Sequence, residues 1–315
     1  FSKCSLLTQI TIPPSILSIG DNAFSECISL LEIKIPSSVI SIGSKAFSDC
    51  SLFTHVTIPS SVVSIGDSPF FNCCHLKSIF VDPTNLNYTS KEGILFTKDL
   101  RDLLCYPSSK EGSSYTIPST VTSIRECAFY NCGSLNKIDI PSSVTSIGNE
   151  AFFLCWSLAS IVIPKSVTSI GKSAFCYCKF TEITIPSSIT SIEESAFSFC
   201  YDLTTVIIPS SVTSIKNNAL YNCESITEIT IPSSVTSIGH AILSNCCNLE
   251  SLIVDSNNPV YVSLDGVLFT KDLQTIIIYP SKKEDSAYTI PSSVKFIGDE
   301  AFSKCKSLNQ IIIPS

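Results

Sequence analysis

Cysteine is the residue type with the most obvious chemical potential in this 315-residue chain, which contains 16 of them. Regularly spaced thiols could bind a metal ion or form a disulfide framework. No Cys-x-x-Cys pair occurs, however, so the spacing gives a structural zinc site little support. Because cysteine packs as a compact hydrophobe, we expect those at one repeated position to be buried and reduced. These residues, the cysteine ladder, are Cys4, Cys27, Cys50, Cys73, Cys132, Cys155, Cys178, Cys200, Cys223, Cys246 and Cys305.

The remaining cysteines lie outside this ladder. Cys105 aligns with an isoleucine in a second copy of the same segment, so it is expected in the core. Cys74 and Cys247 each follow a ladder cysteine, at a position that elsewhere holds serine, glycine, tryptophan or lysine. That variety indicates a solvent-facing position, so these two are the best candidates for reactive or disulfide-forming thiols. Cys127 and Cys176 are expected to be intermediate in exposure between the buried and the solvent-facing cysteines.

Other catalytic groups do not form a recognisable set. His55, His75 and His240 occupy three different positions of the repeat, and no serine or cysteine recurs beside them in a nucleophile motif. Carboxylates such as Glu300 fall on variable positions, and no glycine-rich phosphate loop occurs. The sequence therefore predicts a protein that is not an enzyme and that has no cofactor or metal site.

Composition narrows the choice of partners. Charged residues make up 15% of the chain, its formal net charge is −7, and Arg101 and Arg125 are its only arginines. Nucleic-acid binding needs a basic surface that displaces counterions, so no nucleic-acid partner is expected. No apolar run approaches the ~20 residues that span a bilayer, so no membrane insertion is expected in this segment. The start at Phe1 and the lack of methionine indicate a segment of a longer protein.

The elements that must position all these side chains follow from a repeat. One 23-residue motif runs along the chain: Ser-Leu-x-x-Ile-x-Ile-Pro-Ser-Ser-Val-x-Ser-Ile-Gly-x-x-Ala-Phe-x-x-Cys-x. Its prolines recur with that period, except for one step that is shorter by a single position and two long steps, from Pro59 to Pro118 and from Pro232 to Pro291. A unit this small cannot bury its own apolar face and must stack on its neighbours. The fold predicted is a repeat solenoid that is mainly β.

Local chemistry divides each unit into four parts. Residues 33–35 alternate apolar and polar, which predicts a short strand with inward isoleucines, ended by Pro36. Residues 39–42 form a second extended piece, and Gly43 is expected to allow a bend with positive φ. Residues 46–50 are long enough for one helical or 3₁₀ turn that buries a phenylalanine and a cysteine.

Two hairpin modules interrupt the plain units, at residues 82–117 and 255–290. The modules align without a gap, with residues 93–100 matching residues 266–273. Their order of strand, Lys-Asp turn and strand predicts a β-hairpin that projects from the coil.

The block Ile-Gly-x-x-Ala-Phe-x-x-Cys occurs at residues 19–27, 42–50, 147–155 and 297–305. It resembles the treponemal-type leucine-rich repeat of BspA-like proteins, as does the insert at residues 265–272, and the resemblance covers essentially the whole chain. It implies a right-handed leucine-rich-repeat superhelix with short parallel strands on the inner face, turns outside and two hairpin inserts. Residues 1–315 would form a single solenoid domain. Known members are surface proteins of oral bacteria and mucosal parasitic protists tied to adhesion, which implies a cell-surface or extracellular location.

A binding surface is predicted on the strands. One residue of each strand points away from the core, and strand propensity alone explains its frequent threonines. Exposed apolar residues at this position indicate contacts, which makes Phe80, Ile207 and Ile253 protein-binding candidates. Tyr106 and Tyr279, beside the hairpins, are further candidates because aromatic residues dominate binding hot spots. Alternatively, these rings seal the junction between coil and hairpin.

We therefore expect a non-enzymatic surface protein that adheres to host cells or extracellular matrix, or binds other proteins, through its inner sheet and hairpin modules. The alternative is a structural protein that assembles with itself through uncapped solenoid ends or edges. Asn87 begins the only Asn-x-Ser/Thr sequon and lies in the first insert, where exposure is expected, so it is a possible glycosylation site.

Overall fold

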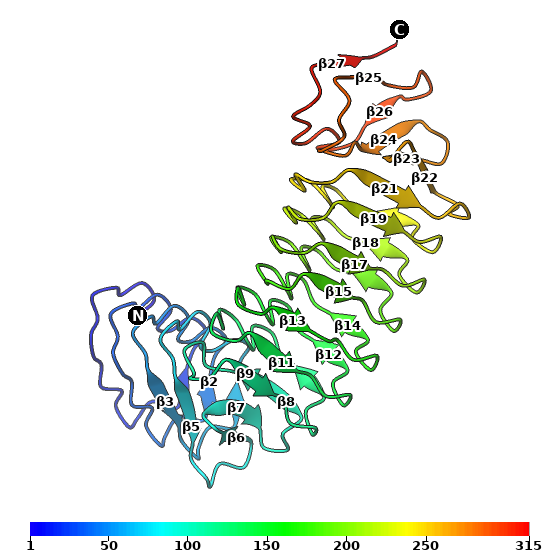
Figure 1. Ribbon diagram of the computed structural model, residues 1–315. Coiled ribbons are helices and arrows are strands. Elements are labelled where there is room, and N and C mark those ends of the chain that lie inside the picture. The colour runs from blue at the N-terminus through cyan, green and yellow to red at the C-terminus, as the bar shows by residue number, and fades with distance from the viewer. Residues whose placement is uncertain (315) are drawn as a thin grey trace. The chain divides into compact units, whose positions relative to one another are not determined.

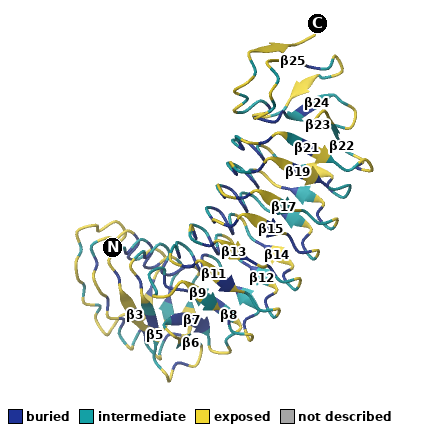
Figure 2. Cartoon of the chain, viewed as in Figure 1, coloured by how far each residue is buried: buried dark blue, intermediate teal, exposed yellow. Residues whose placement is uncertain are grey.

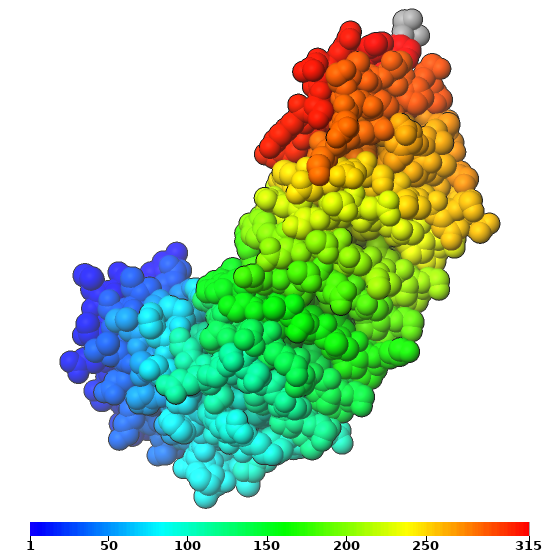
Figure 3. Space-filling view, viewed as in Figure 1, coloured from blue at the N-terminus to red at the C-terminus, as the bar shows by residue number. Residues whose placement is uncertain are grey.

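The computed structural model describes residues 1–314, and the regular elements among them are all strands (Figure 1). The chain divides into two compact units, Phe1–Leu158 (unit 1) and Ala159–Ser315 (unit 2). Each unit is a stack of coils with one hairpin module, and the two are described separately. In the space-filling view, colour follows residue number, and within unit 2 it changes in successive bands along the stack (Figure 3). Coils that follow one another in the sequence are therefore neighbours in the stack.

Each plain coil contributes strands to two parallel ladders. The first ladder uses the Ile-x-Ile segment and the second uses the Ser-Ile pair before the glycine. In unit 1 the first ladder contains β3 (His55–Ile58), β5 (Ser78–Val81), β9 (Ser114–Thr116) and β11 (Lys137–Asp139). Its second ladder contains β1 (Ser18–Ile19), β2 (Ser41–Ile42), β4 (Ser64–Ile65), β8 (Asp102–Cys105), β10 (Ser123–Ile124) and β12 (Ser146–Ile147).

Unit 2 repeats this arrangement. Its first ladder contains β13 (Ser160–Ile161), β15 (Glu182–Thr184), β17 (Thr205–Ile207), β19 (Glu228–Ile231), β21 (Ser251–Val254), β25 (Ala287–Thr289) and β27 (Gln310–Ile312). Its second ladder contains β14 (Ser169–Ile170), β16 (Ser191–Ile192), β18 (Ser214–Ile215), β20 (Ser237–Ile238), β24 (Thr275–Ile278) and β26 (Phe296–Ile297). The parallel solenoid expected from the 23-residue period is therefore confirmed.

The inward isoleucines of the first ladder are also confirmed. In β3, Val56 and Ile58 are buried, whereas His55 and Thr57 are exposed. β3 and β5 pair in parallel with Thr57 opposite Phe80, so outward positions of successive coils form a row. Figure 2 shows this alternation of buried and exposed residues along the coils. The period-2 geometry of a strand thus separates a uniform core face from a variable outer face.

The outer turns are neither helical nor 3₁₀, so that expectation was wrong. Lys45 and Asp49 have φ of 52° and 59°, which interrupts any helix. Alternate N–H groups leave the coil, since the Phe47 N–H donates to the Pro69 carbonyl at 2.9 Å and the Asp49 N–H donates to the Phe71 carbonyl at 2.8 Å. Hydrogen bonds from one coil to the next replace the bonds within a helix, and they offset the roughly 1–3 kcal/mol that a strained backbone residue costs.

Gly43 serves a different purpose from the one its sequence position suggested. Its φ is not positive, but a Cβ at Gly43 would lie 2.4 Å from the backbone nitrogen of Asp21 in the preceding coil. At Gly43, glycine therefore allows the close approach of two backbones, although Arg125, Glu193 and Lys216 occupy the same position in other coils.

A row of aromatic rings forms the centre of each unit. Phe24, Phe47 and Phe70 stack with ring centroids 5.6 Å apart and planes 7° apart. In unit 2, Phe175 and Phe197 stack in the same way at 5.6 Å. Each ring fills the space between two coils, which the coil that carries it could not close alone.

The hairpin modules contain three strands each, not a projecting hairpin of two. In the first module β6 (Tyr88–Lys91), β7 (Ile94–Thr97) and β8 are antiparallel, and β8 then pairs in parallel with β10. In the second, β22 (Tyr261–Leu264) and β23 (Val267–Thr270) precede β24 in the same order. The middle strands are buried, so each module is built into the second ladder and does not extend freely from it.

A buried asparagine holds the start of each module, and sequence reasoning missed it. The Asn85 side-chain amide donates to the Pro59 and Val62 carbonyls, at 2.8 and 3.0 Å, and its oxygen accepts from the Asn87 and Tyr88 N–H groups. Asn258 makes the same four bonds in the second module. The signal was available as Asp-x-x-Asn-x-x-Tyr in both inserts.

The first prediction concerns the aromatic row. Phe47→Ala removes a fully buried ring that contacts rings on both sides, and should cost roughly 3–5 kcal/mol. Phe47→Leu is the matched control, because Leu220 fills this position elsewhere in the chain. Urea unfolding of the variants measures the difference. A loss for Phe47→Ala no larger than that for Phe47→Leu would contradict the assigned role of the ring.

Candidate protein-binding surface

The outward row of unit 2 contains an apolar groove. It has a volume of about 570 Å³, and Val162, Thr184 and Ile207 contribute outward side chains to it. Val162 is 80% exposed and Ile207 is 54% exposed, so both present hydrocarbon to solvent. Lys165 and Glu182 are the charged residues that line the groove. We call this feature the strand groove.

The strand groove lies beside a shortened coil. The repeat that runs from Pro164 to Pro186 is shorter than the regular unit by a single position. Among the described residues β15 pairs with β17 but not with β13, so the first ladder is interrupted between β13 and β15. Prolines at the ends of these strands complete the lining: Pro164, Pro186 and Pro209.

The other apolar candidates lie outside the strand groove. Ile253, on β21, is exposed, and Thr230 of β19 lies opposite it in the register. Phe80 is 50% exposed on β5 in unit 1. Ile207 shares the groove with Val162, an outward residue that was not singled out from the sequence. Its signal was an apolar residue at an outward strand position.

Tyr106 and Tyr279 are not surface residues, so their assignment as protein contacts was wrong. They are 3% and 2% exposed and stack on Phe129 and Phe302, with ring centroids 5.0 and 5.2 Å apart. Each tyrosine lies one full repeat before its stacking partner and so occupies the phenylalanine position of the repeat. Burial raises the pKa of both phenols. Their buried, stacked positions agree with the alternative expectation, that these rings seal the junction between coil and hairpin module.

Asn87 is exposed in the loop before β6. Its backbone N–H donates to the Asn85 side chain at 2.8 Å. An accessible sequon is necessary for glycosylation, and the modification stays a prediction.

The cysteine ladder is a packing feature. Within residues 1–314 every cysteine is a thiol and none forms a disulfide. The thiols hydrogen bond between coils, since Cys73 Sγ donates to the Phe47 carbonyl oxygen at 3.1 Å. Burial raises the pKa of Cys50 and Cys155 to about 12, which suppresses the reactive thiolate.

Two ladder cysteines depart from the expected burial. Cys4 is exposed and Cys305 is half-buried, because among the described residues each lies in a coil that is stacked on one side only. Cys105 is buried, as expected, and so are Cys127 and Cys176. Cys74 and Cys247 are half-exposed, in agreement with their irregular position in the repeat.

The described residues contain no group of three or more His, Cys, Asp or Glu side chains that could hold a metal ion. The histidines lie in unrelated surroundings: His55 Nδ1 contacts Thr54, His75 Nδ1 contacts Cys74 Sγ at 3.3 Å, and His240 Nδ1 lies 2.8 Å from Asp299. Within residues 1–314 no helix has the length and apolarity needed to cross a bilayer.

A comparison of the chain with known protein families agrees with this stack of repeated coils. The model of the BspA type leucine rich repeat region matches in six copies, over residues 1–110, 105–180, 168–284 and 281–315. The chain belongs to the BspA-type leucine-rich-repeat family. Repeat proteins of this kind are generally non-enzymatic scaffolds that bind other proteins. No curated protein sequence matches the chain significantly.

Several solved structures of bacterial proteins are similar to this chain. A leucine rich cell surface protein from Faecalibacterium prausnitzii is 31% identical over 78% of this chain, with a TM-score of 0.57, and this chain spans 59% of that protein. A leucine-rich repeat protein from Eubacterium ventriosum is 27% identical over 72% of this chain and 80% of its own, with a TM-score of 0.56. One from Bacteroides ovatus is 26% identical over 99% and 74%, with a TM-score of 0.50.

The second prediction concerns thiol reactivity. Iodoacetamide at pH 8 should label Cys4, Cys74 and Cys247 of the folded chain and leave buried thiols such as Cys50 and Cys155 unlabelled. Peptide mass spectrometry measures the labelling, and unfolding in urea should make every thiol reactive. Rapid labelling of Cys50 in the folded chain would disprove its burial.

Proposed function

We propose that this chain is a protein-binding scaffold of a cell surface, which adheres to host cells or extracellular matrix through the outward row of its first ladder. The observation that carries the proposal is the strand groove, where Val162 and Ile207 expose hydrocarbon on either side of Thr184. A soluble protein gains nothing from exposed apolar side chains that lie together, whereas a partner that covers them gains roughly 25 cal/mol for each Å² of apolar surface removed from water.

Two further facts support the surface location and the type of partner. The Faecalibacterium prausnitzii relative is described as a cell surface protein. The inward positions of the coils are nearly uniform, so differences between partners must be recognised by the outward positions. These hold Thr184, Ile207 and Thr230 on successive strands, and together they form an extended surface suited to a large partner.

The proposal includes neither catalysis nor a cofactor. It also treats residues 1–315 as one functional solenoid. Assembly of the chain with itself stays the alternative, and light scattering of the purified chain distinguishes the two.

The third prediction tests the strand groove. Val162→Asp combined with Ile207→Asp should weaken binding to fixed epithelial cells or purified matrix proteins at least tenfold, since a charge in an apolar contact is desolvated without a partner. Val63→Asp is the matched control, because Val63 is an exposed valine of unit 1, outside the groove. Biolayer interferometry measures affinity, and circular dichroism confirms folding. Unchanged affinity in the folded double variant would place the contact elsewhere.

A further inference from the structure

The two hairpin modules have the same backbone plan and a shortened outer turn. In β8, Leu103 pairs with Ile124 of the next coil, and Tyr106 occupies the position of Phe129. Tyr106 follows Leu103 by three positions, whereas Phe129 follows Ile124 by five. The outer turn of the module is thus shorter than that of a plain coil, and space is left between the coils before and after it.

Large side chains close this space in the first module. Phe71 and Tyr130 come from the two flanking coils, and their ring centroids are 4.2 Å apart. Arg125 Nη2 lies 3.3 Å from Asp67 Oδ1 and links the same two coils. In the first module, side chains of the two flanking coils therefore fill the space that the shortened outer turn leaves.

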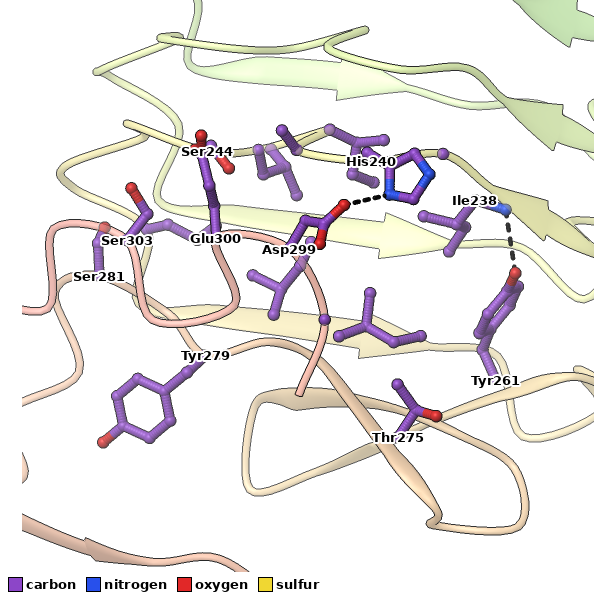
Figure 4. Close-up of a pocket in the computed structure, with 18 of the residues that line it drawn as sticks. Ile238, His240, Ser244, Tyr261, Thr275, Tyr279, Ser281, Asp299, Glu300 and Ser303 are labelled. Carbon is purple, nitrogen blue, oxygen red and sulfur yellow. Dashed lines mark hydrogen bonds and ion pairs between the residues drawn. The ribbon is translucent and has the colours of Figure 1, made fainter. Parts of the chain in front are cut away.

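The second module leaves the same space open. Ser244 and Ser303 align with Phe71 and Tyr130, and Gly298 aligns with Arg125. A cavity of about 250 Å³ lies there, between the coils that contain His240 and Asp299 (Figure 4). It exceeds the roughly 150 Å³ of a cavity that accepts benzene. Three small side chains in place of three large ones thus turn a filled junction into a potential binding site.

The cavity combines apolar walls with a group of oxygen atoms. Its apolar lining comprises Ile238, Ile242, Leu243, Leu249, Ile277 and Ile278. Figure 4 shows Ser244, Ser281, Ser303 and Glu300 gathered at one end. Among residues 1–314, the side-chain oxygens of Ser244, Ser303 and Glu300 have no hydrogen-bond or ion-pair partner within the protein and are reached by solvent, whereas Ser281 donates to the Cys246 carbonyl.

The charges of the cavity favour a cation. Glu300, Asp299 and His240 are the ionisable acidic and basic residues that line it, apart from the phenols of Tyr261 and Tyr279. Asp299 Oδ2 is 2.8 Å from His240 Nδ1, so this carboxylate already has a partner. Glu300 is exposed and its carboxylate has no protein partner, so water solvates it until a ligand displaces that water, and the net charge of the lining is negative whether or not His240 is protonated.

We propose that this cavity binds a protonated primary amine carried on a short aliphatic chain. An ammonium group has three N–H donors and no acceptor, which matches one carboxylate and two hydroxyl oxygens. The aliphatic chain would pack on the isoleucine and leucine walls. The amine could be a free molecule or the lysine side chain of a bound protein, and only the second source rests on the proposed function.

Isothermal titration calorimetry with n-pentylamine tests the charge preference. The folded chain should bind n-pentylamine saturably, and should bind 1-pentanol and hexanoate at least tenfold more weakly. Glu300→Gln should weaken n-pentylamine binding at least tenfold, while Glu193→Gln, in another coil, should leave it unchanged. No saturable binding, or equal binding of the amine and the alcohol, would overturn the proposal.

The first module supplies a variant that should fold. Ser244→Phe combined with Ser303→Tyr reproduces its aromatic pair and should abolish n-pentylamine binding without lowering the melting temperature. Retained binding in this folded variant would also overturn the proposal. Nα-acetyl-lysine methylamide distinguishes the two sources: binding that its Nε-acetylated form loses assigns the site to lysine side chains, and binding of n-pentylamine alone assigns it to free amines. Neither measurement uses a partner protein, so its outcome does not depend on whether the chain adheres to host cells or matrix.

Discussion

Stacking of one coil on the next is the constraint on which this structure depends. A 23-residue coil has too few residues to enclose its own phenylalanine, so Phe47 is covered by Phe24 on one side and Phe70 on the other. The backbone follows the same rule, because the Phe47 N–H donates to the Pro69 carbonyl of the next coil. The left-handed residues of the outer turn and the glycine that lets two backbones approach both serve this contact between coils. Stability is therefore shared between neighbours, as in other repeat proteins.

Function can vary because stacking uses only the inward positions. The outward side chains of the first ladder can change without disturbing the core. The shortened repeat between Pro164 and Pro186 accompanies the strand groove. The hairpin modules shorten the outer turn, and the space that results is filled by Phe71 and Tyr130 in one module and left open beside Ser244 and Ser303 in the other. The two proposed binding sites thus both lie where the repeat is irregular.

The sequence predicted most of the fold, because a repeat samples each position many times. The inward isoleucines, the buried cysteines and the parallel stacking were all readable from period and alternation. The outer turns were not, since Gly-x-x-Ala-Phe suits a helical turn locally and only bonds to the next coil select the alternating φ values of Lys45 and Asp49. Tyr106 and Tyr279 were misassigned because the period that relates each of them to a phenylalanine was not applied across the module. Cavities could not be predicted, since they depend on side chains that meet from coils on either side of an entire hairpin module.

Amide hydrogen exchange of the unaltered chain tests the stacking account most directly. The N–H groups of Lys45, Phe47 and Asp49 donate to the neighbouring coil at 2.8 to 3.0 Å, although they lie in outer turns. The account predicts that they exchange as slowly as the N–H groups of the two strand ladders, because both open only when coils separate. Turn amides that exchange rapidly while the ladder amides stay protected would show that stacking does not hold the outer turns, and would contradict the account.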